Sequence, residues 1–542
     1  GKADSRGGKA DSRGGKADSR GGTTDSRGGK ADSRGGTTDS RGGTTDSRGG
    51  KADSRGGTTD SRGGKADSRG GTTDSPFISS GNFVLLPSFI KAGMKSITLF
   101  LTGSLLWGCS IDGLDPGTGN AGDKAPETQE GRFNAFLKQE MTGIYFWADQ
   151  TRQKAGSVAL DTNSQGYFDA LKYAGDAWSR LDGGAFEDEL AGVDDGSDSG
   201  FGWIATIWTL GASSTIEAKI NHVYPGSPAD EAGLQRGDMI TRVDGSALSD
   251  ANLSKLFNTR TAITVQTRKK NKTESTLTLT PREFDVTPIA NETIIESGGK
   301  KIGYMFYTSF VYKNSQSLDD LSAAFTRFKQ AGVEEFILDL RYNGGGYLSA
   351  AIRLSSLLAP GKNVEQQDVL IYKTWNEEYQ QQFAGNAVER FDNQLPASAR
   401  LELPRLWVLT SSNTASASEI VISGLAPYMD VITIGDKTTG KNAGGSIFVF
   451  PDDKSKGVYL ITMEYTNSNG KSVAGGIPRT YGYNAATYYA DTTALGDPRD
   501  AFIAIALEKI AGTRSGSGQT SEDATIRAEG GRAGRLIMND RP

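Results

Sequence analysis

A short stretch of the chain, SSNTASASEI at residues 411–420, crowds together hydroxyl side chains that could act as a nucleophile. Five of its first eight residues carry a hydroxyl: Ser411, Ser412, Thr414, Ser416 and Ser418. Ser416-x-x-Glu419 has the pattern of a capping box, which satisfies free N–H groups at the start of a helix. A cap needs only one hydroxyl, and the N–H groups at a helix start could also hold an oxyanion. Spacing alone does not choose the nucleophile among the five.

A hydroxyl nucleophile needs a base, and the chain has a single histidine, His222, in a stretch that reads as a separate binding domain. We therefore expect a lysine to act as the base instead. Lys441 follows a glycine-bearing loop. To act near neutral pH its pKa must fall from about 10.4 to about 7–8, which burial among apolar groups can achieve. The small and apolar stretch AGGSIFVF, residues 443–450, is expected to provide that environment.

Two glycine-containing segments have sequences that could form further sites. The run Asn343-Gly344-Gly345-Gly346 lets the backbone approach a substrate and present an N–H to developing negative charge, although it could also be a plain turn. Gly435-x-x-x-x-Gly440-Lys441 nearly matches a phosphate-binding loop, but Asn442 stands where Ser or Thr is needed, and a strand pattern follows. We expect no nucleotide, no metal and no other cofactor.

The elements that must position these residues alternate between strand and helix from about residue 286. Strand patterns occur at residues 301–310, 334–340, 406–410 and 431–435, and helix patterns at residues 317–332, 347–359 and 418–428. This alternation predicts β-α-β units with parallel strands. Because parallel strands end at the same edge of a sheet, the three loops should converge there.

Residues 129 to 512 as a whole resemble the carboxyl-terminal processing proteases, or tail-specific proteases, which are Ser-Lys peptidases. The matching stretches are ILDLRYNGGGYL, NTASASEI, TTGK and GVYLITMEYTNSNGKSVAGGIP. The resemblance implies a ClpP/crotonase-like α/β catalytic core with a PDZ domain and a small N-terminal helical domain.

The same resemblance assigns the site residues. It implies that Ser416 is the nucleophile, that Lys441 is the base, and that the oxyanion is held by the backbone N–H of Ala417 and one from Gly344 or Gly345. The chain departs from the family at two points. Gly445 stands where many members have a Gln that helps orient the lysine, and GIPR at residues 476–479 replaces the family's Gly-Ile-x-Pro-Asp.

The stretch TIEAKINHVYPGSPADEAGLQRGDMITRVDGSAL, residues 215–248, resembles a PDZ domain through its GSPA, AGL, GD and VDG segments. Upstream, Gly200, Phe201, Gly202 and Trp203 occupy the place of the loop that binds a peptide's terminal carboxylate. Backbone N–H groups would hold that carboxylate, and a strand edge would pair with the peptide.

The N-terminal part reads as an export segment after a low-complexity run. Residues 1–70 are ten heptads, GKADSRG or GTTDSRG, without Leu, Ile, Val or aromatic residues, and so they cannot bury a core. From Met94 the sequence MKSITLFLTGSLLWGCS resembles a lipoprotein signal, with Cys109, the only cysteine, as the lipidated residue. A disulfide within the chain is thereby excluded.

These observations predict seven parts of the chain: repeats and linker at 1–93, which are either disordered or a mis-called start, signal and lipobox at 94–109, a tether at 110–128, a helical domain at 129–190, a PDZ domain at 195–285, the protease core at 286–512 and a loose tail at 513–542. The helical domain is predicted from the helical periodicity of residues 132–148 and 167–181.

The predicted function is that of a serine endopeptidase in the cell envelope, facing the periplasm or the outer surface. It would be held to the membrane by lipid and would act on protein C-terminal tails. The alternative is a catalytically weak or inactive PDZ-bearing lipoprotein that only grips peptides. The net charge of −5 and the lack of a basic stripe argue against nucleic acid as a partner.

Overall fold

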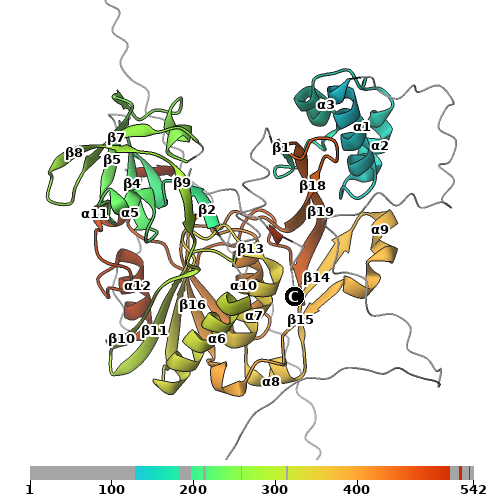
Figure 1. The fold of residues 1–542 in the computed structure, drawn as a ribbon. Helices are drawn as coiled ribbons and strands as arrows, with labels where there is room; N and C mark the ends of the chain where they lie inside the picture. Colours follow the sequence, from blue (N-terminus) through green and yellow to red (C-terminus); the bar gives the residue numbers. More distant parts are fainter. Residues whose placement is uncertain are drawn as a thin grey trace, which may run out of the picture. The chain divides into compact units, whose positions relative to one another are not determined.

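The computed structural model describes residues 128–182, 197–210, 215–257, 259–312 and 315–512, and two short strands at 524–527 and 536–537. Figure 1 shows these elements coloured along the chain. The heptads, the tether and the lipobox at Cys109 lie outside the described residues, so those expectations stay predictions. Within the described part, no helix is both long and apolar enough to cross a membrane.

The larger α/β part of the described chain is built on a five-stranded sheet with the order β10-β11-β12-β16-β17. β10 runs antiparallel to β11, and the other neighbours are parallel, as the alternation of strand and helix predicted. The bounds are Ile289–Ser297 (β10), Lys300–Tyr307 (β11), Glu335–Asp339 (β12), Arg405–Thr410 (β16) and Asp430–Gly435 (β17).

Helices cover both faces of this sheet (Figure 1). Because side chains alternate along a strand, Met305 and Tyr307 of β11 pack into one core while Tyr304 and Phe306 pack into the other. The first core is closed by α6 (Ser315–Gln330), α7 (Leu348–Leu358) and α10 (Ala417–Leu425), and the second by α12 (Ala501–Ile510). The α/β fold class expected from the sequence is confirmed.

A second sheet, with the order β13-β21-β18-β19-β14-β15 and β1 added at β19, lies beside the first cluster of helices. Its strands are β1 (Arg180–Asp182), β13 (Gly346–Tyr347), β14 (Val369–Trp375), β15 (Val388–Arg390), β18 (Ala443–Val449), β19 (Gly457–Asn467) and β21 (Leu536–Ile537). Short helices complete the core: α8 (Gly361–Glu365), α9 (Glu377–Gln382), η3 (Ala384–Asn386), η4 (Ala397–Ala399) and α11 (Ala485–Ala490).

The N-terminal described segment is helical, with α1 (Gln129–Thr142), α2 (Ala148–Ala155) and α3 (Ser164–Leu171) packed against β18 and β19. The helical periodicity of residues 167–181 does not give a helix of that length, because α3 ends at Leu171. Beyond it, the Asp176 carboxylate accepts hydrogen bonds from the N–H groups of Trp178 (2.8 Å) and Ser179 (2.9 Å), which fixes a turn leading into β1.

The PDZ region forms its own sheet, with the order β20-β3-β4-β5-β7-β8. Its elements are β3 (Trp203–Leu210), β4 (Thr215–Val223), α5 (Pro228–Glu231), β5 (Met239–Val243), β6 (Ser246–Ala247), η2 (Leu253–Leu256), β7 (Ile263–Arg268), β8 (Glu274–Leu279) and β20 (Ala524–Arg527). A separate pair is made by β2 (Ser197–Gly200) and β9 (Arg282–Asp285).

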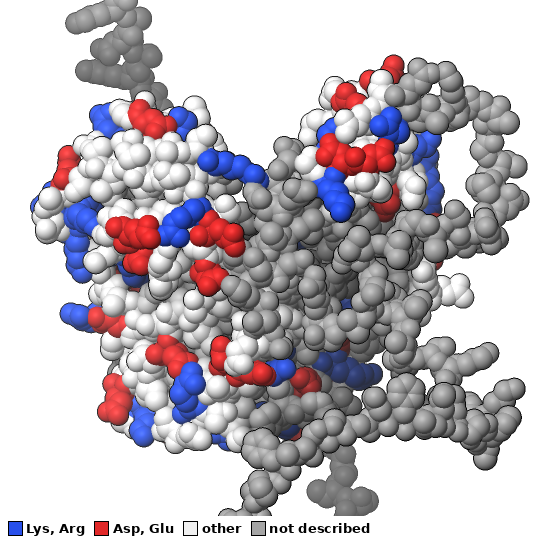
Figure 2. All heavy atoms as spheres, viewed as in Figure 1, with Lys and Arg blue, Asp and Glu red and all other residues white. Residues whose placement is uncertain are grey.

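On the face drawn in Figure 2, Lys and Arg alternate with Asp and Glu over the described residues, so this face offers no extended area of one charge.

Candidate active site

Of the five hydroxyl side chains of residues 411–418, three tie two loops together and two do not. Three of them donate to the backbone carbonyls of residues 340–343, where β12 runs into the glycine loop: Ser411, Thr414 (2.7 Å) and Ser418 (3.0 Å). Ser412 is exposed. Ser416 is fully buried, and within the described chain its Oγ makes no hydrogen bond. The crowding therefore fixes the geometry of the loops and leaves the Ser416 hydroxyl available for chemistry.

The backbone of Ser416 is held in an unusual conformation. Its φ of 58° and ψ of −116° lie outside the regions that residues other than glycine commonly adopt. The conformation is fixed by hydrogen bonds on both sides of the residue. The Ser416 N–H donates to Glu419 Oε2 at 2.8 Å, and its carbonyl accepts from the Ile420 N–H at 2.9 Å. Such conformations persist where the surroundings over-determine them, and they cluster at active sites.

Glu419 joins the start of α10 to the loop that carries Lys441. Its buried carboxylate accepts the N–H groups of Ser416 (2.8 Å), Lys441 (2.8 Å) and Gly440 (2.7 Å) and the hydroxyl of Thr438 (2.5 Å). Burial raises the pKa of Glu419, and these donors lower it in part. The capping pattern seen in the sequence is thus extended, because the same carboxylate also binds a second strand end.

Tyr465 of β19 makes a second connection between the same two residues. Its hydroxyl lies 2.8 Å from the carbonyl oxygen of Lys441 and 3.2 Å from that of Ser416. Burial raises the pKa of Tyr465 well above its ordinary value, so the phenol stays protonated and remains a donor. Ser416 and Lys441, predicted to meet at one edge of the sheet, are therefore brought together at both their N–H and C=O groups.

The Lys441 side chain is buried, at 1% exposure, in an aromatic pocket. Its Nζ donates to the Tyr459 hydroxyl at 3.2 Å and lies 5.2 Å from the ring centroid of Tyr459 and 5.5 Å from that of Trp178. Burial, and next the charge of Arg180, lower the pKa of Lys441 to about 7. The direction matches the sequence-based expectation, but the rings that surround Nζ come from Tyr459 and Trp178 rather than from residues 443–450.

Of the two glycine N–H groups considered as oxyanion donors, only that of Gly344 is left without a partner among the described residues. The Gly345 N–H donates to Asn343 Oδ1 at 2.9 Å and is therefore engaged. Asn343 also ties this loop to the start of α10, because its carbonyl accepts from the Ala415 N–H at 3.2 Å. Over the described chain, the N–H groups of Ala417 and Gly344 make no hydrogen bond. These two groups are the donors that could hold an oxyanion.

The loop expected to bind a peptide carboxylate, Gly200–Trp203, leads directly into strand β3, which lies between β4 and the short strand β20. Gly202 has a φ of 81°, and a Cβ there would lie 2.0 Å from Ser227 Cβ, so only glycine fits. The side chains of Phe201 and Trp203 are buried in the PDZ core, which leaves the backbone as the part available to a ligand. In the structure, β20 pairs antiparallel with β3, so this edge accepts an added strand.

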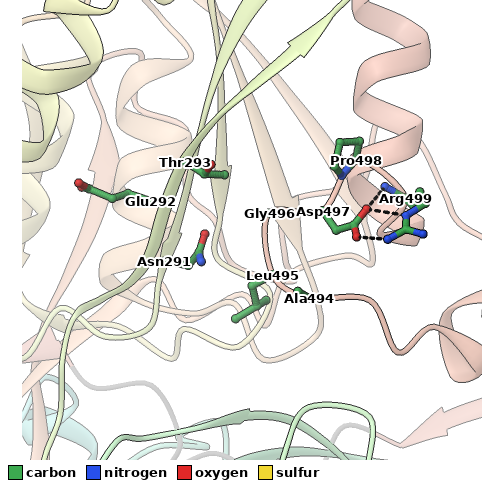
Figure 3. A pocket seen from close by; sticks show the side chains of 9 residues that line it. All are labelled: Asn291, Glu292, Thr293, Ala494, Leu495, Gly496, Asp497, Pro498 and Arg499. Atoms are coloured by element: carbon green, nitrogen blue, oxygen red, sulfur yellow. Dashed lines mark hydrogen bonds and ion pairs between the residues drawn. The ribbon is translucent and has the colours of Figure 1, made fainter. Parts of the chain in front are cut away.

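His222 and a surface pocket are not part of the site formed around Ser416 and Lys441. The His222 ring contacts Tyr224 and Phe306, and burial lowers the pKa of His222 to about 4. A pocket of about 660 Å³ lies between β10 and residues 494–499 (Figure 3). Its loop is closed by the Asp497–Arg499 ion pair, and none of the residues that line it belongs to the site described above.

Lys441 leads into strand β18 rather than a helix, which is not the geometry of a phosphate-binding loop.

Sequence reasoning missed Tyr459, Tyr465 and Trp178 as parts of the site. The only available signal was that the two tyrosines fall within the family-like stretch at residues 457–478. Trp178 carried no signal, because its segment was expected to be helical.

Two regions of the chain match known families. Residues 301–482 match peptidase family S41, and residues 219–265 match the PDZ domain. The chain is 26% identical over 305 residues to the carboxyl-terminal-processing protease of Synechocystis sp., covering 55% of this chain and 66% of that protein. It is 29% identical over 251 residues to the carboxy-terminal processing protease CtpA of Bacillus subtilis, covering 45% and 48%. The chain thus spans about half to two thirds of the length of these relatives.

A crystal structure from Bacteroides fragilis NCTC 9343, assigned to the S41 proteases, is 27% identical and superposes with a TM-score of 0.57. The match covers 73% of this chain and all of that one. Fold, site and matches together define a serine-type peptidase domain joined to a PDZ domain. Over these regions the chain is similar to the carboxyl-terminal processing proteases.

Proposed function

We propose that the chain is a serine endopeptidase that cleaves protein substrates recognised through their C-terminal tails, using Ser416 as nucleophile and Lys441 as base. The observation that carries the proposal is the joining of these two residues through Glu419 and Tyr465: one has a buried hydroxyl without a partner among the described residues, and the other is a buried lysine. A lysine with a pKa near 7 is partly neutral at physiological pH and can accept a proton.

The reaction would proceed in two halves. Ser416 Oγ attacks the scissile carbonyl carbon while its proton passes to Lys441 Nζ, and the N–H groups of Ala417 and Gly344 bind the oxyanion. The carbon–nitrogen bond then breaks, and the Lys441 ammonium gives its proton to the leaving amine. A water molecule, deprotonated by the neutral Lys441, attacks the acyl carbon. The bond from that carbon to Ser416 Oγ then breaks, the carboxylic acid product leaves, and the Lys441 ammonium returns its proton to Ser416 Oγ.

Tail recognition would fall to the PDZ domain. The loop at Gly200–Trp203 would hold a terminal carboxylate with its backbone, and β3 would pair with the peptide as an added strand. The pairing of β20 with β3 supports this part of the proposal, because it is an antiparallel addition at the same edge. Since such pairing uses main-chain groups, recognition would tolerate varied tail sequences.

The cellular setting is part of the proposal. Lipidation at Cys109 would hold the enzyme at the cell envelope, facing the periplasm or the outer surface. The intact mass of the mature protein purified from membranes tests this directly, since lipidation adds the mass of acyl chains and removes every residue before Cys109. A soluble product without added mass excludes the anchor.

Cleavage of an unfolded protein by the wild type, Ser416→Ala and Lys441→Ala tests the enzymatic claim. A general base contributes about 10²–10⁴-fold, so Lys441→Ala should lose at least that much, and Ser416→Ala should be inactive. A wild-type chain that binds a peptide but never cleaves it would instead be a binding protein.

A further inference from the structure

Gly445 leaves open which residue orients Lys441, and the answer lies in the space around that glycine. A Cβ at position 445 would lie 2.7 Å from Tyr459 Cζ, 2.8 Å from the Tyr459 hydroxyl and 2.4 Å from the carbonyl oxygen of Leu460. All three distances are shorter than real Cβ contacts. No side chain can therefore extend from position 445, because the phenol of Tyr459 and the backbone of β19 already fill that volume.

The Tyr459 phenol reaches the lysine from this position. The side chain is buried, at 1% exposure, and its hydroxyl lies 3.2 Å from Lys441 Nζ. A phenol can accept a hydrogen bond from an ammonium group and donate one to a neutral amine, so it can hold Nζ in both protonation states. Burial raises the pKa of Tyr459 well above its ordinary value, and the phenol therefore keeps its proton while the lysine titrates.

The Tyr459 ring is itself held from two sides. Arg180 stands opposite Tyr459 in the β1–β19 ladder, and its guanidinium carbon lies 4.9 Å from the ring centroid. On the other side, Tyr459 pairs with Ile447 of β18, next to an irregularity in the register at Gly444 and Gly445. Both sheet neighbours thus fix where the hydroxyl lies relative to Lys441.

We infer that Tyr459, in the space that Gly445 leaves free, is the positioning residue that orients the Lys441 amine. This inference rests on the proposed function of Lys441 as the base. Tyr459 touches neither the substrate nor the reacting hydroxyl in this account and acts only through Lys441. Fixing the amine in one place matters because a small misplacement of a catalytic group can cost orders of magnitude in rate.

The test compares Tyr459→Phe with Tyr167→Phe in the full chain, measuring the pH profile of kcat/KM for peptide cleavage. Tyr167 is a matched control, because it is fully buried and its hydroxyl has no partner among the described residues. Tyr459→Phe should lower kcat about tenfold with KM little changed, since a hydrogen bond to a charged group is lost. The acid limb of its profile should move to lower pH, by about half a unit or more, because the phenol oxygen stabilises the ammonium form. Tyr167→Phe should match the wild type.

The inference is overturned if Tyr459→Phe keeps the wild-type kcat and acid limb, or if both variants lose activity to the same extent. Ser416→Ala and Lys441→Ala, run beside them, separate this failure from a failure of the proposed function. If cleavage survives in those two variants, the dyad is wrong. If cleavage is lost in them but Tyr459→Phe is unaffected, only the positioning role is wrong.

A second variant, Gly445→Ala, separates loss of the Tyr459 hydroxyl from a change in packing caused by phenylalanine at position 459. Gly445→Ala keeps the Tyr459 hydroxyl but places a methyl group against the ring and the Leu460 carbonyl. It should lower kcat with a displaced acid limb, as in Tyr459→Phe. Wild-type kinetics in Gly445→Ala would also contradict the inference.

Discussion

The backbones of Ser416 and Lys441 are joined twice, through Glu419 at their N–H groups and through Tyr465 at their carbonyl oxygens. One Glu419 oxygen, Oε2, accepts both N–H groups at 2.8 Å. The proposed nucleophile and the proposed base thus lie on loops that follow different strands, and neither loop can shift without breaking hydrogen bonds to a shared partner. This connection is made by backbone groups of the two residues and uses neither the Ser416 hydroxyl nor the Lys441 amine.

Glu419→Gln tests this connection. The carboxylate accepts four hydrogen bonds, and an amide would turn one acceptor into a donor facing another donor. We expect the free energy of unfolding to fall by about 1–3 kcal/mol, and cleavage to fall at least about tenfold. Urea unfolding and kcat measure the two effects. Glu283→Gln, at an exposed position, is the control. Equal stability of the two variants would contradict the role of Glu419 in joining the two loops.

Ser416→Gly should stabilise the protein while it abolishes cleavage. The substitution relieves a positive φ and removes a buried hydroxyl that has no partner among the described residues, each costing about 1–3 kcal/mol. The added freedom of glycine in the unfolded chain offsets about 0.5–1 kcal/mol of this gain. Thermal unfolding should therefore show a higher Tm than the wild type, whereas Ser412→Gly, exposed, should not. A lower Tm in Ser416→Gly would show that the conformation is not strained.

The titration of Lys441 should appear in the pH dependence of stability. Its pKa is about 7 in the folded protein, against an ordinary value of 10.5. Between about pH 7 and 10 the unfolded chain therefore holds a proton that the folded protein lacks, so folding becomes more favourable as pH rises. Lys441→Met loses this dependence. The wild-type unfolding free energy minus that of the variant should rise by up to about 1.4 kcal/mol per pH unit in this window. A flat difference would mean that the buried lysine stays charged.

Removal of residues 513–542 should strengthen peptide binding at the PDZ domain. Strand β20, from that region, pairs with the edge of β3 from Leu210 to Ile207, where an added peptide would pair. A segment of the same chain competes at high effective concentration, so its removal should raise the affinity for a labelled C-terminal peptide severalfold. Fluorescence polarisation in a Ser416→Ala background measures this without cleavage. Unchanged affinity would show that β20 does not occupy the binding edge.

The sequence sufficed for the parts of the molecule that depend on local pattern. The strand at Arg405–Thr410 and the helix at Ala417–Leu425 were predicted from hydrophobic periodicity, and the meeting of their loops with Lys441 followed from the geometry of parallel strands. The choice of Ser416 among five hydroxyls needed the family resemblance. In the structure, three of the other hydroxyls are hydrogen-bonded to residues 340–343 and the fourth is exposed, which is consistent with that choice.

The lining of the lysine pocket could not be predicted, because it depends on contacts between distant segments. Trp178 and Arg180 approach Lys441 only because β1 pairs with β19, and the turn at Asp176 that makes this possible interrupts a helical pattern. Gly445 could be recognised as a departure from the family. That Tyr459 fills its place follows only from the packing of two neighbouring strands.

The most direct test of the central claim is the pH dependence of Ser416 acylation. A serine-directed fluorophosphonate, followed by intact mass and peptide mapping, should label Ser416 alone, with a rate that rises with pH to a plateau and a midpoint near 7. Lys441→Ala should show no such limb and should react at least about 10²-fold more slowly. Labelling at another residue, or the same midpoint near 7 in the Lys441→Ala variant, would contradict the account.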